Sequence, residues 1–223
     1  MLQDELYRIA EPMLEKVKAH PFWSGLRDGT LPPEVLLHYA EQDAWHLLPS
    51  YGRALARCAS NADGDGHAPL LVSAANGSLE AAGHMADQLG KLAESLGRPR
   101  PDGAPSPANP NTHAQTSFML AASADTTGVG AAALLPMTWF HRYVSADLME
   151  RHEPGSRYAD WIADYYPGEE FLGFVGAYLS MVDELGASAS ETELARIREA
   201  FTHGARYEWM FAEGCWTQAA WAL

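Results

Sequence analysis

Cysteine and lysine are scarce in this sequence of 223 residues. The two cysteines, Cys58 and Cys215, are too few and too far apart for a disulfide framework, and the sequence contains neither a CxxC pair nor a Cys/His zinc pattern. Lysine occurs only at Lys16, Lys18 and Lys91, and 29 acidic residues outnumber 15 basic ones for a formal charge of −14. Because nucleic acids and anionic membranes are bound by clustered basic residues, we expect neither as a partner.

Long apolar runs are also missing, and no charged segment followed by an apolar one opens the sequence. These absences predict neither a transmembrane helix nor a secretory signal, and we expect a soluble cytoplasmic protein. With 47% hydrophobic and 10% aromatic residues, the chain can bury a substantial core. We therefore expect one domain over residues 1–223.

Strand-like alternation is absent, and apolar residues instead recur at helical spacing. In the first segment they are Leu2, Leu6, Ile9, Met13 and Val17. Similar patterns along the chain predict an all-α bundle of about seven or eight helices. The Pro-rich stretch 98–112 interrupts them, and we interpret it as a surface loop.

Three local signals predict helix boundaries and a bend. Thr30 precedes two prolines and is expected to cap the next helix. Pro49 is expected to kink that helix just beyond His46, because proline removes an internal hydrogen bond. Ser188 and Glu191 have the spacing of a capping box for the last helix.

Five segments, in this order, resemble the TenA, or thiaminase II, family. They are His20-Pro21-Phe22 with Gly25 and Gly29-Thr30-Leu31-Pro32, Tyr39 with Gln42-Asp43, Ala133 to Trp139, Tyr158-x-x-Trp161-Ile162 with Tyr165, and Tyr207-Glu208 with Phe211. The resemblance implies a heme-oxygenase-like helical bundle that forms a homo-oligomer, a dimer or a tetramer. It also implies a pocket for a small amine-bearing substrate and leaves room for a partner enzyme.

The same resemblance implies roles for three residues. Asp43 matches an aspartate that contacts the substrate amine, Tyr165 a pocket tyrosine, and Glu208 an acid/base glutamate. The family's nucleophilic cysteine falls at Met137, whose thioether has no proton to lose and cannot attack as a thiolate does. Three family tyrosines fall at His46, Gln115 and His141.

Ordinary structural explanations exist for each substituted residue. Asp43 and His46, three apart, could form a satisfied polar pair, and Met137 is ordinary core filler. Two histidines at two pocket positions nevertheless favour function. We predict four catalytic residues, five substrate-binding residues, no metal site and no cofactor. The catalytic set is Asp43, Glu208, His46 and His141; the binding set is Gln115, Met137, Trp139, Tyr165 and Tyr207.

Two carboxylates and two imidazoles without a nucleophile favour acid/base chemistry at a C–N bond. One example is intramolecular amination, in which a substrate amine displaces a leaving group and closes an aziridine ring, as in TenA-like cyclases of natural product biosynthesis. Hydrolysis of an aminopyrimidine or thiamin is an alternative. A metal-dependent oxidase using Glu80 and His84, and a non-catalytic binding or partner-stabilising protein, are two more.

Overall fold

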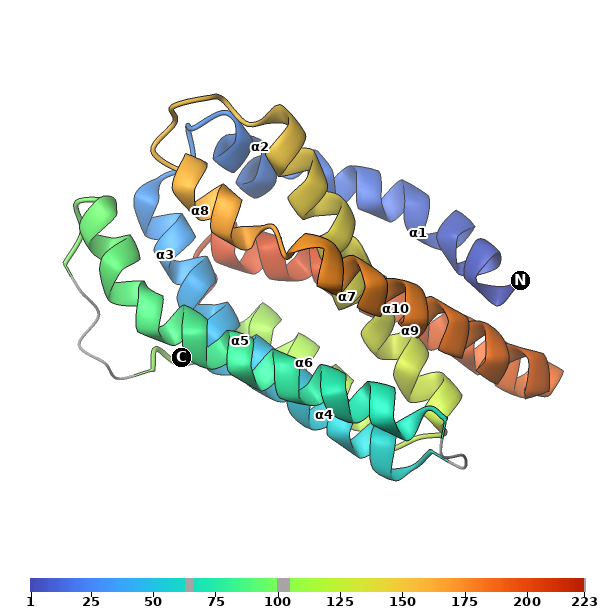
Figure 1. Cartoon of the computed structure of the whole chain (residues 1–223). Coiled ribbons are helices and arrows are strands. Elements are labelled where there is room, and N and C mark those ends of the chain that lie inside the picture. The colour runs from blue at the N-terminus through green and yellow to red at the C-terminus, as the bar shows by residue number, and fades with distance from the viewer. Residues whose placement is uncertain (63–65, 100–104, 223) are drawn as a thin grey trace.

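Helices account for the regular structure of this computed structural model, which describes residues 1–62, 66–99 and 105–222 (Figure 1). The expected all-α class is confirmed for this part of the chain. The helices are α1 (Leu2–Lys18), α2 (Pro21–Arg27), α3 (Pro33–Gln42), the π-helix η1 (Asp43–Leu47), α4 (Leu48–Ser60), α5 (Ala68–Ser95), α6 (Pro110–Ala122), α7 (Thr127–Arg151), α8 (Ala159–Tyr165), α9 (Gly168–Ser188) and α10 (Glu191–Trp216).

The elements α3, η1 and α4 form one continuous helix, so the described residues contain nine helices, more than the seven or eight expected. The short α2 accounts for the difference: the ring of His20 caps it by accepting a hydrogen bond from Phe22 N, and Pro21 fits its first turn. The wide turn of η1 immediately precedes Pro49. At its end, Leu48 N donates to Asp43 O, five residues back.

Two predicted caps are wrong. The N-cap of α3 is Pro32 and not Thr30. The last helix is capped two residues later than expected, where Ser190 Oγ accepts from Glu193 N at 3.2 Å. In the predicted loop, residues 100–104 lie outside the described ranges, and α6 begins within the stretch at Pro110, where Asn109 caps it.

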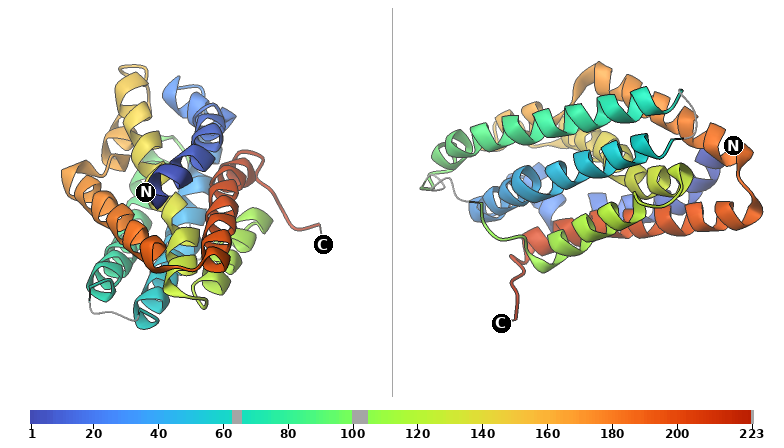
Figure 2. Two further views of the ribbon diagram at one scale, coloured as in Figure 1. Left: turned by 90° about the vertical axis from the view of Figure 1, so that its right-hand side faces the viewer. Right: turned by 90° about the horizontal axis from the view of Figure 1, so that it is seen from below.

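The helix α7 packs against α10 and also contacts α1, α2, α4, α6, α8 and α9. Residues 127–136 of α7 are buried on every side, as expected for a helix with apolar residues all round. Gly204 of α10 allows close approach, because a Cβ there would lie 2.4 Å from Ala133 O. The helices α4 and α5 run antiparallel side by side, and the residues after α10 leave the bundle (Figure 2).

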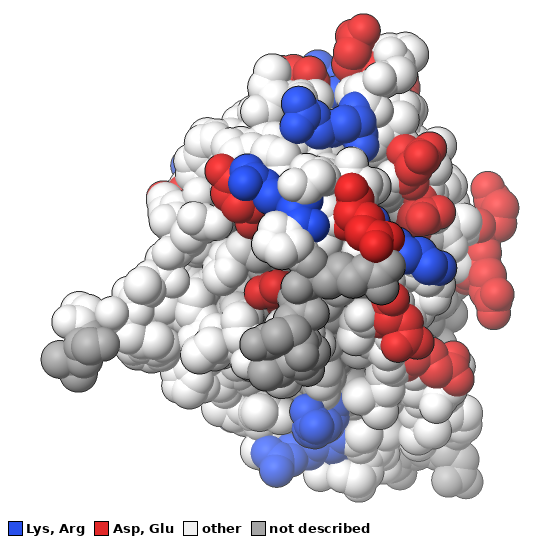
Figure 3. All heavy atoms as spheres, turned by 90° about the vertical axis from the view of Figure 1, so that its left-hand side faces the viewer, with Lys and Arg blue, Asp and Glu red and all other residues white. Residues whose placement is uncertain are grey.

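Charged side chains of both signs are mixed on the face shown in Figure 3, where Lys and Arg occur in small groups between acidic residues. This face therefore offers no continuous basic surface of the kind that nucleic acids require. Among the described helices, none is long and apolar enough to cross a membrane.

Candidate active site

Asp43 and Glu208 meet inside the bundle from η1 and α10. Asp43 is 6% exposed, and burial raises its pKa to about 7. Burial raises the pKa of Glu208 to about 8, and the charge of Asp43 adds to this increase. Asp43 is buried and Glu208 is partly buried, and two such carboxyl groups that repel each other titrate as a pair, so near neutrality the pair retains a proton.

Gln115 of α6 joins this pair. It is 1% exposed, and its Nε2 donates a hydrogen bond to Glu208 Oε1 at 2.9 Å. Within the described residues, Gln115 Oε1 and Asp43 Oδ1 are buried without a hydrogen-bond partner. Buried polar atoms are normally paired, so these two oxygens mark the part of the interior that is suited to a polar ligand.

Aromatic side chains form a wall beside the carboxyl pair. The hydroxyl groups of Tyr39 and Tyr165 lie 3.1 Å apart, and both tyrosines interact electrostatically with Asp43. Trp161 stacks on Tyr165 with ring centroids 4.6 Å apart, and the Trp23 ring lies 5.8 Å from the Tyr165 ring. Tyr39 was absent from the predicted site set, although its position four residues before Asp43 places both on one helix face.

His141 of α7 belongs to this wall. The centroid of its ring lies 4.5 Å from that of Tyr165 and 5.2 Å from that of Phe171, and both ring pairs are nearly perpendicular. Burial lowers its pKa to about 4, so the ring is neutral at physiological pH. Burial therefore disfavours an imidazolium here, and a catalytic role of His141 near neutrality falls to its neutral ring.

His46 contacts the loop before α6. Its Nε2 lies 2.6 Å from Ser106 O, and Gln42 also holds this loop through Ser106 Oγ, Pro107 O and Asn109 N. The wider turn of η1 places residues three apart further round the axis than an α-helix would. The contacts of His46 are therefore those of a residue that fastens the loop, and not those of the polar pair with Asp43 that helical spacing alone would allow.

His46→Ala is expected to lower the free energy of unfolding by about 1 kcal/mol, the usual net value of one hydrogen bond. Turnover should fall far less than the ~10²–10⁴-fold typical of a lost acid or base. Chemical denaturation and steady-state rates measure the two effects. The matched control is the exposed His84→Ala. A 100-fold loss of rate in a variant of unchanged stability would restore His46 to the catalytic set.

Trp139 and Tyr207 contact other parts of the molecule. Trp139 is 4% exposed and packs on Tyr7 and Phe201 at 5.8 and 6.0 Å. Tyr207 lies against Phe118 at 5.0 Å in a surface cleft of about 190 Å³. Their predicted substrate contacts are thus not supported, because neighbouring positions on a helix point in different directions. Met137 is partly buried against the core and, four residues before His141, shares its face of α7.

The metal alternative lacks a ligand cluster. In residues 1–62, 66–99 and 105–222, His, Cys, Asp and Glu side chains nowhere form a group of three that could hold a metal ion. Glu80 and His84 are exposed on α5, and Glu80 accepts from Asn76 Nδ2 at 2.7 Å. Within the described part of the chain, Glu80 and His84 therefore belong to no cluster of three possible metal ligands.

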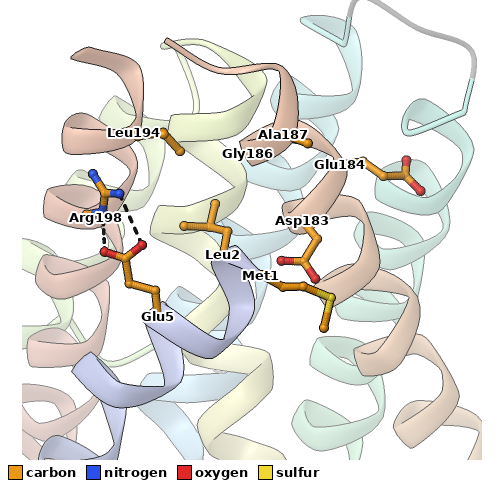
Figure 4. Close-up of a pocket in the computed structure, with 9 residues that line it drawn as sticks. All are labelled: Met1, Leu2, Glu5, Asp183, Glu184, Gly186, Ala187, Leu194 and Arg198. Carbon is orange, nitrogen blue, oxygen red and sulfur yellow. Dashed lines mark hydrogen bonds and ion pairs between the residues drawn. The ribbon is translucent and has the colours of Figure 1, made fainter. Parts of the chain in front are cut away.

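A separate groove of about 480 Å³ lies at the opposite end of α1 from α2 (Figure 4). Residues of α1, α9 and the first turns of α10 line it, and Arg198 donates to both carboxylate oxygens of Glu5 at its edge. It contains none of the predicted site residues, so the carboxyl pair and the groove are distinct features.

Comparison with known proteins finds relatives that match most of this chain. The chain is 36% identical over 187 residues to the thiamine biosynthesis multifunctional protein ThiED of Corynebacterium efficiens, a match covering 82% of this chain and 24% of that longer protein. It is 27% identical to the aminopyrimidine aminohydrolase of Bacillus subtilis, with 91% and 84% covered. The solved TenA homologue from P. horikoshii superimposes with a TM-score of 0.79 at 28% identity and covers 97% of this chain and 99% of its own.

The family model described as TENA/THI-4/PQQC matches residues 8–219, which include both carboxyl groups, the aromatic wall and the loop that His46 contacts. On this match and the helical architecture together, the chain belongs to the TENA/THI-4/PQQC family.

Proposed function

We propose that this protein is an enzyme that cleaves a C–N bond of a small amine-bearing metabolite by acid/base catalysis, with Asp43 and Glu208 as its catalytic groups and without a covalent cysteine intermediate. The buried carboxyl pair is the observation that carries this proposal, because burial raises both pKa values toward neutrality. A general acid or base works best when its pKa lies near the working pH. Such tuning is a recognised mark of functional carboxyl groups.

The two carboxyl groups have different tasks in this proposal. Ionised Asp43 binds the substrate amine, for which its unpaired Oδ1 is available. Protonated Glu208 donates its proton to the departing nitrogen while the C–N bond breaks. Water then adds to the carbon and returns a proton to Glu208, so an amine and water become an alcohol and ammonia. Atoms, charges and electrons balance in this overall reaction, which changes no oxidation state.

The surroundings favour a planar substrate that carries an amino group. Tyr39, Tyr165 and Trp161 provide ring surfaces for a flat heterocycle. No basic side chain contributes to the raised pKa values of Asp43 and Glu208 among the described residues. An ionised member of the pair therefore gains most from a cationic or N–H-bearing ligand.

Hydrolysis of an aminopyrimidine is the form of this chemistry that the relatives' names favour, since one relative is called an aminopyrimidine aminohydrolase. Aziridine ring closure forms a C–N bond instead: a carboxylate of the pair accepts a proton from the substrate's own amine, whose nitrogen displaces an activated leaving group from carbon. His141 then contributes as a neutral ring and not as an acid, because burial lowers its pKa to about 4.

The purified protein is expected to release ammonia from 4-amino-5-aminomethyl-2-methylpyrimidine. Intact-mass spectrometry during turnover should show the unmodified protein, because Met137 cannot form the covalent adduct that a cysteine forms. Tight binding of this compound without ammonia release, alone or with a partner enzyme, would contradict catalysis and favour a binding protein. If the protein neither binds this compound nor releases ammonia from it, the compound is not its substrate.

A further inference from the structure

The carboxamide of Gln115 contacts a single member of the carboxyl pair. We propose that Gln115 is a positioning residue that keeps Glu208 Oε1 as an acceptor and thereby directs the proton of Glu208 to Oε2. The effect of this positioning on turnover rests on the proposed function, whereas its effect on the ionisation of Glu208 does not.

The chemistry of an amide explains this assignment. Nε2 of Gln115 carries two protons and accepts none, so Glu208 Oε1, 2.9 Å away, must offer a lone pair to it. An oxygen that accepts this bond is the less favourable place for the carboxyl proton. The proton of a neutral Glu208 then sits on Oε2, where it can be donated in another direction.

The helix α6 holds Gln115 firmly for this task. Asn109 caps the helix by accepting from Thr112 N at 2.9 Å, and Pro110 follows the cap directly. Gln42 Oε1 in turn accepts from Asn109 N at 2.9 Å, which ties the start of α6 to the residue before Asp43. The side chain of Gln115 is 1% exposed and therefore has little freedom to choose another partner.

A tyrosine, expected at this position from the family resemblance, acts differently. Its hydroxyl group can rotate and can either donate or accept a hydrogen bond, so it does not decide which partner holds the proton. A carboxamide separates these functions, with Nε2 as donor and Oε1 as acceptor. Among the described residues Gln115 Oε1 has no hydrogen-bond partner, so the bond from Nε2 to Glu208 Oε1 is the contact that orients the amide.

Other groups near Glu208 shift its pKa in the direction opposite to that caused by Gln115. Burial and the charge of Asp43 raise the pKa of Glu208, while the Gln115 bond lowers it. The ionisable groups of the neighbouring helices that interact with Glu208 are Asp43 of η1, Tyr51 of α4 and Tyr165 of α8. Glu5 of α1 pairs with Arg198, and the ring of His20, the N-cap residue of α2, lies 3.0 Å from Glu213, so both groups contact other residues of α10. Gln115 is thus the neighbour that favours ionised Glu208.

The test follows the ionisation of Glu208 directly. Protein labelled with carbon-13 at the glutamate carboxyl carbon is titrated by NMR, and Glu208→Gln identifies the signal. Gln115→Met, which has a similar length and no N–H, should raise the titration midpoint by about one pH unit, because a hydrogen bond to the charged form is lost. Gln88→Met on α5 is the matched control and should leave the midpoint unchanged.

An unchanged or lowered midpoint in Gln115→Met would overturn the proposal, the latter showing that protonated Glu208 donates to the amide oxygen. Should Gln115→Met fail to fold, Gln115→Asn replaces it, since this amide is one methylene too short to reach Glu208 and predicts the same rise. With a substrate that the protein turns over, the alkaline limb of the pH profile of kcat/KM in Gln115→Met should move to higher pH by the same amount as the NMR midpoint. A raised NMR midpoint in a protein inactive on every amine would support the positioning role and contradict the catalytic proposal.

Discussion

Asp43→Asn is expected to abolish turnover in a protein that remains folded. The amide has the shape of the carboxyl group but can neither bind a cationic amine by charge nor exchange a proton near neutrality. Loss of an acid or base of this kind typically costs ~10²–10⁴-fold in rate. Ammonia release under single-turnover conditions measures the chemical step, and circular dichroism measures the fold.

Glu208→Gln should have a loss of similar size, since the proposed departure of nitrogen needs its proton. Asp160→Asn is the matched control, because Asp160 is exposed on α8 next to the aromatic wall's Trp161 and should retain full activity. Full activity in both Asp43→Asn and Glu208→Gln would remove the basis of the catalytic assignment.

The stability of the wild-type protein is expected to fall as the pH rises from 6.5 to 8.5. The folded-state pKa values of Asp43 and Glu208, about 7 and about 8, lie above the ordinary values of 3.8 and 4.5. The folded protein therefore binds more protons than the unfolded chain across this window, and its advantage is lost as the pair ionises. The pair should contribute a decrease of about 3 kcal/mol over these two pH units.

The lower limit of 6.5 reduces an opposing effect from His20, His38 and above all His141, whose pKa values burial lowers. Burial lowers the pKa of the His141 ring from 6.5 to about 4, so the unfolded chain binds the extra proton and stability rises with pH up to about 6.5. Above that limit the carboxyl pair dominates the slope.

The double variant Asp43→Asn/Glu208→Gln should remove this decrease and exceed the wild type in stability at pH 8.5. Urea denaturation at several pH values gives the free energies, and Asp160→Asn should follow the wild-type slope. A wild-type protein whose stability rises or stays constant between pH 6.5 and 8.5 would show that the pair is ionised throughout. Greater stability with lower activity is the usual compromise at a functional site that buries charge.

The site was partly predictable, and its errors have physical causes. Asp43, Tyr165 and Glu208 were predicted from segments far apart in the sequence, and the structure brings them together with Gln115. The different setting of His46 depends on the π-helical turn of η1, which a search for helical spacing does not detect. His141 lies in the predicted region, but its neutral state follows from burial among aromatic rings.

The sequence by itself determined the all-α class and the absence of a thiol at Met137, because these depend on residue spacing and side-chain chemistry. The tertiary structure decided which partners each polar group meets. Gln115 of α6 contacts Glu208 of α10, and His46 of η1 contacts Ser106 in the loop before α6. The raised pKa values of the carboxyl pair likewise exist only after folding, since burial and mutual repulsion require groups that are distant in sequence to lie close together.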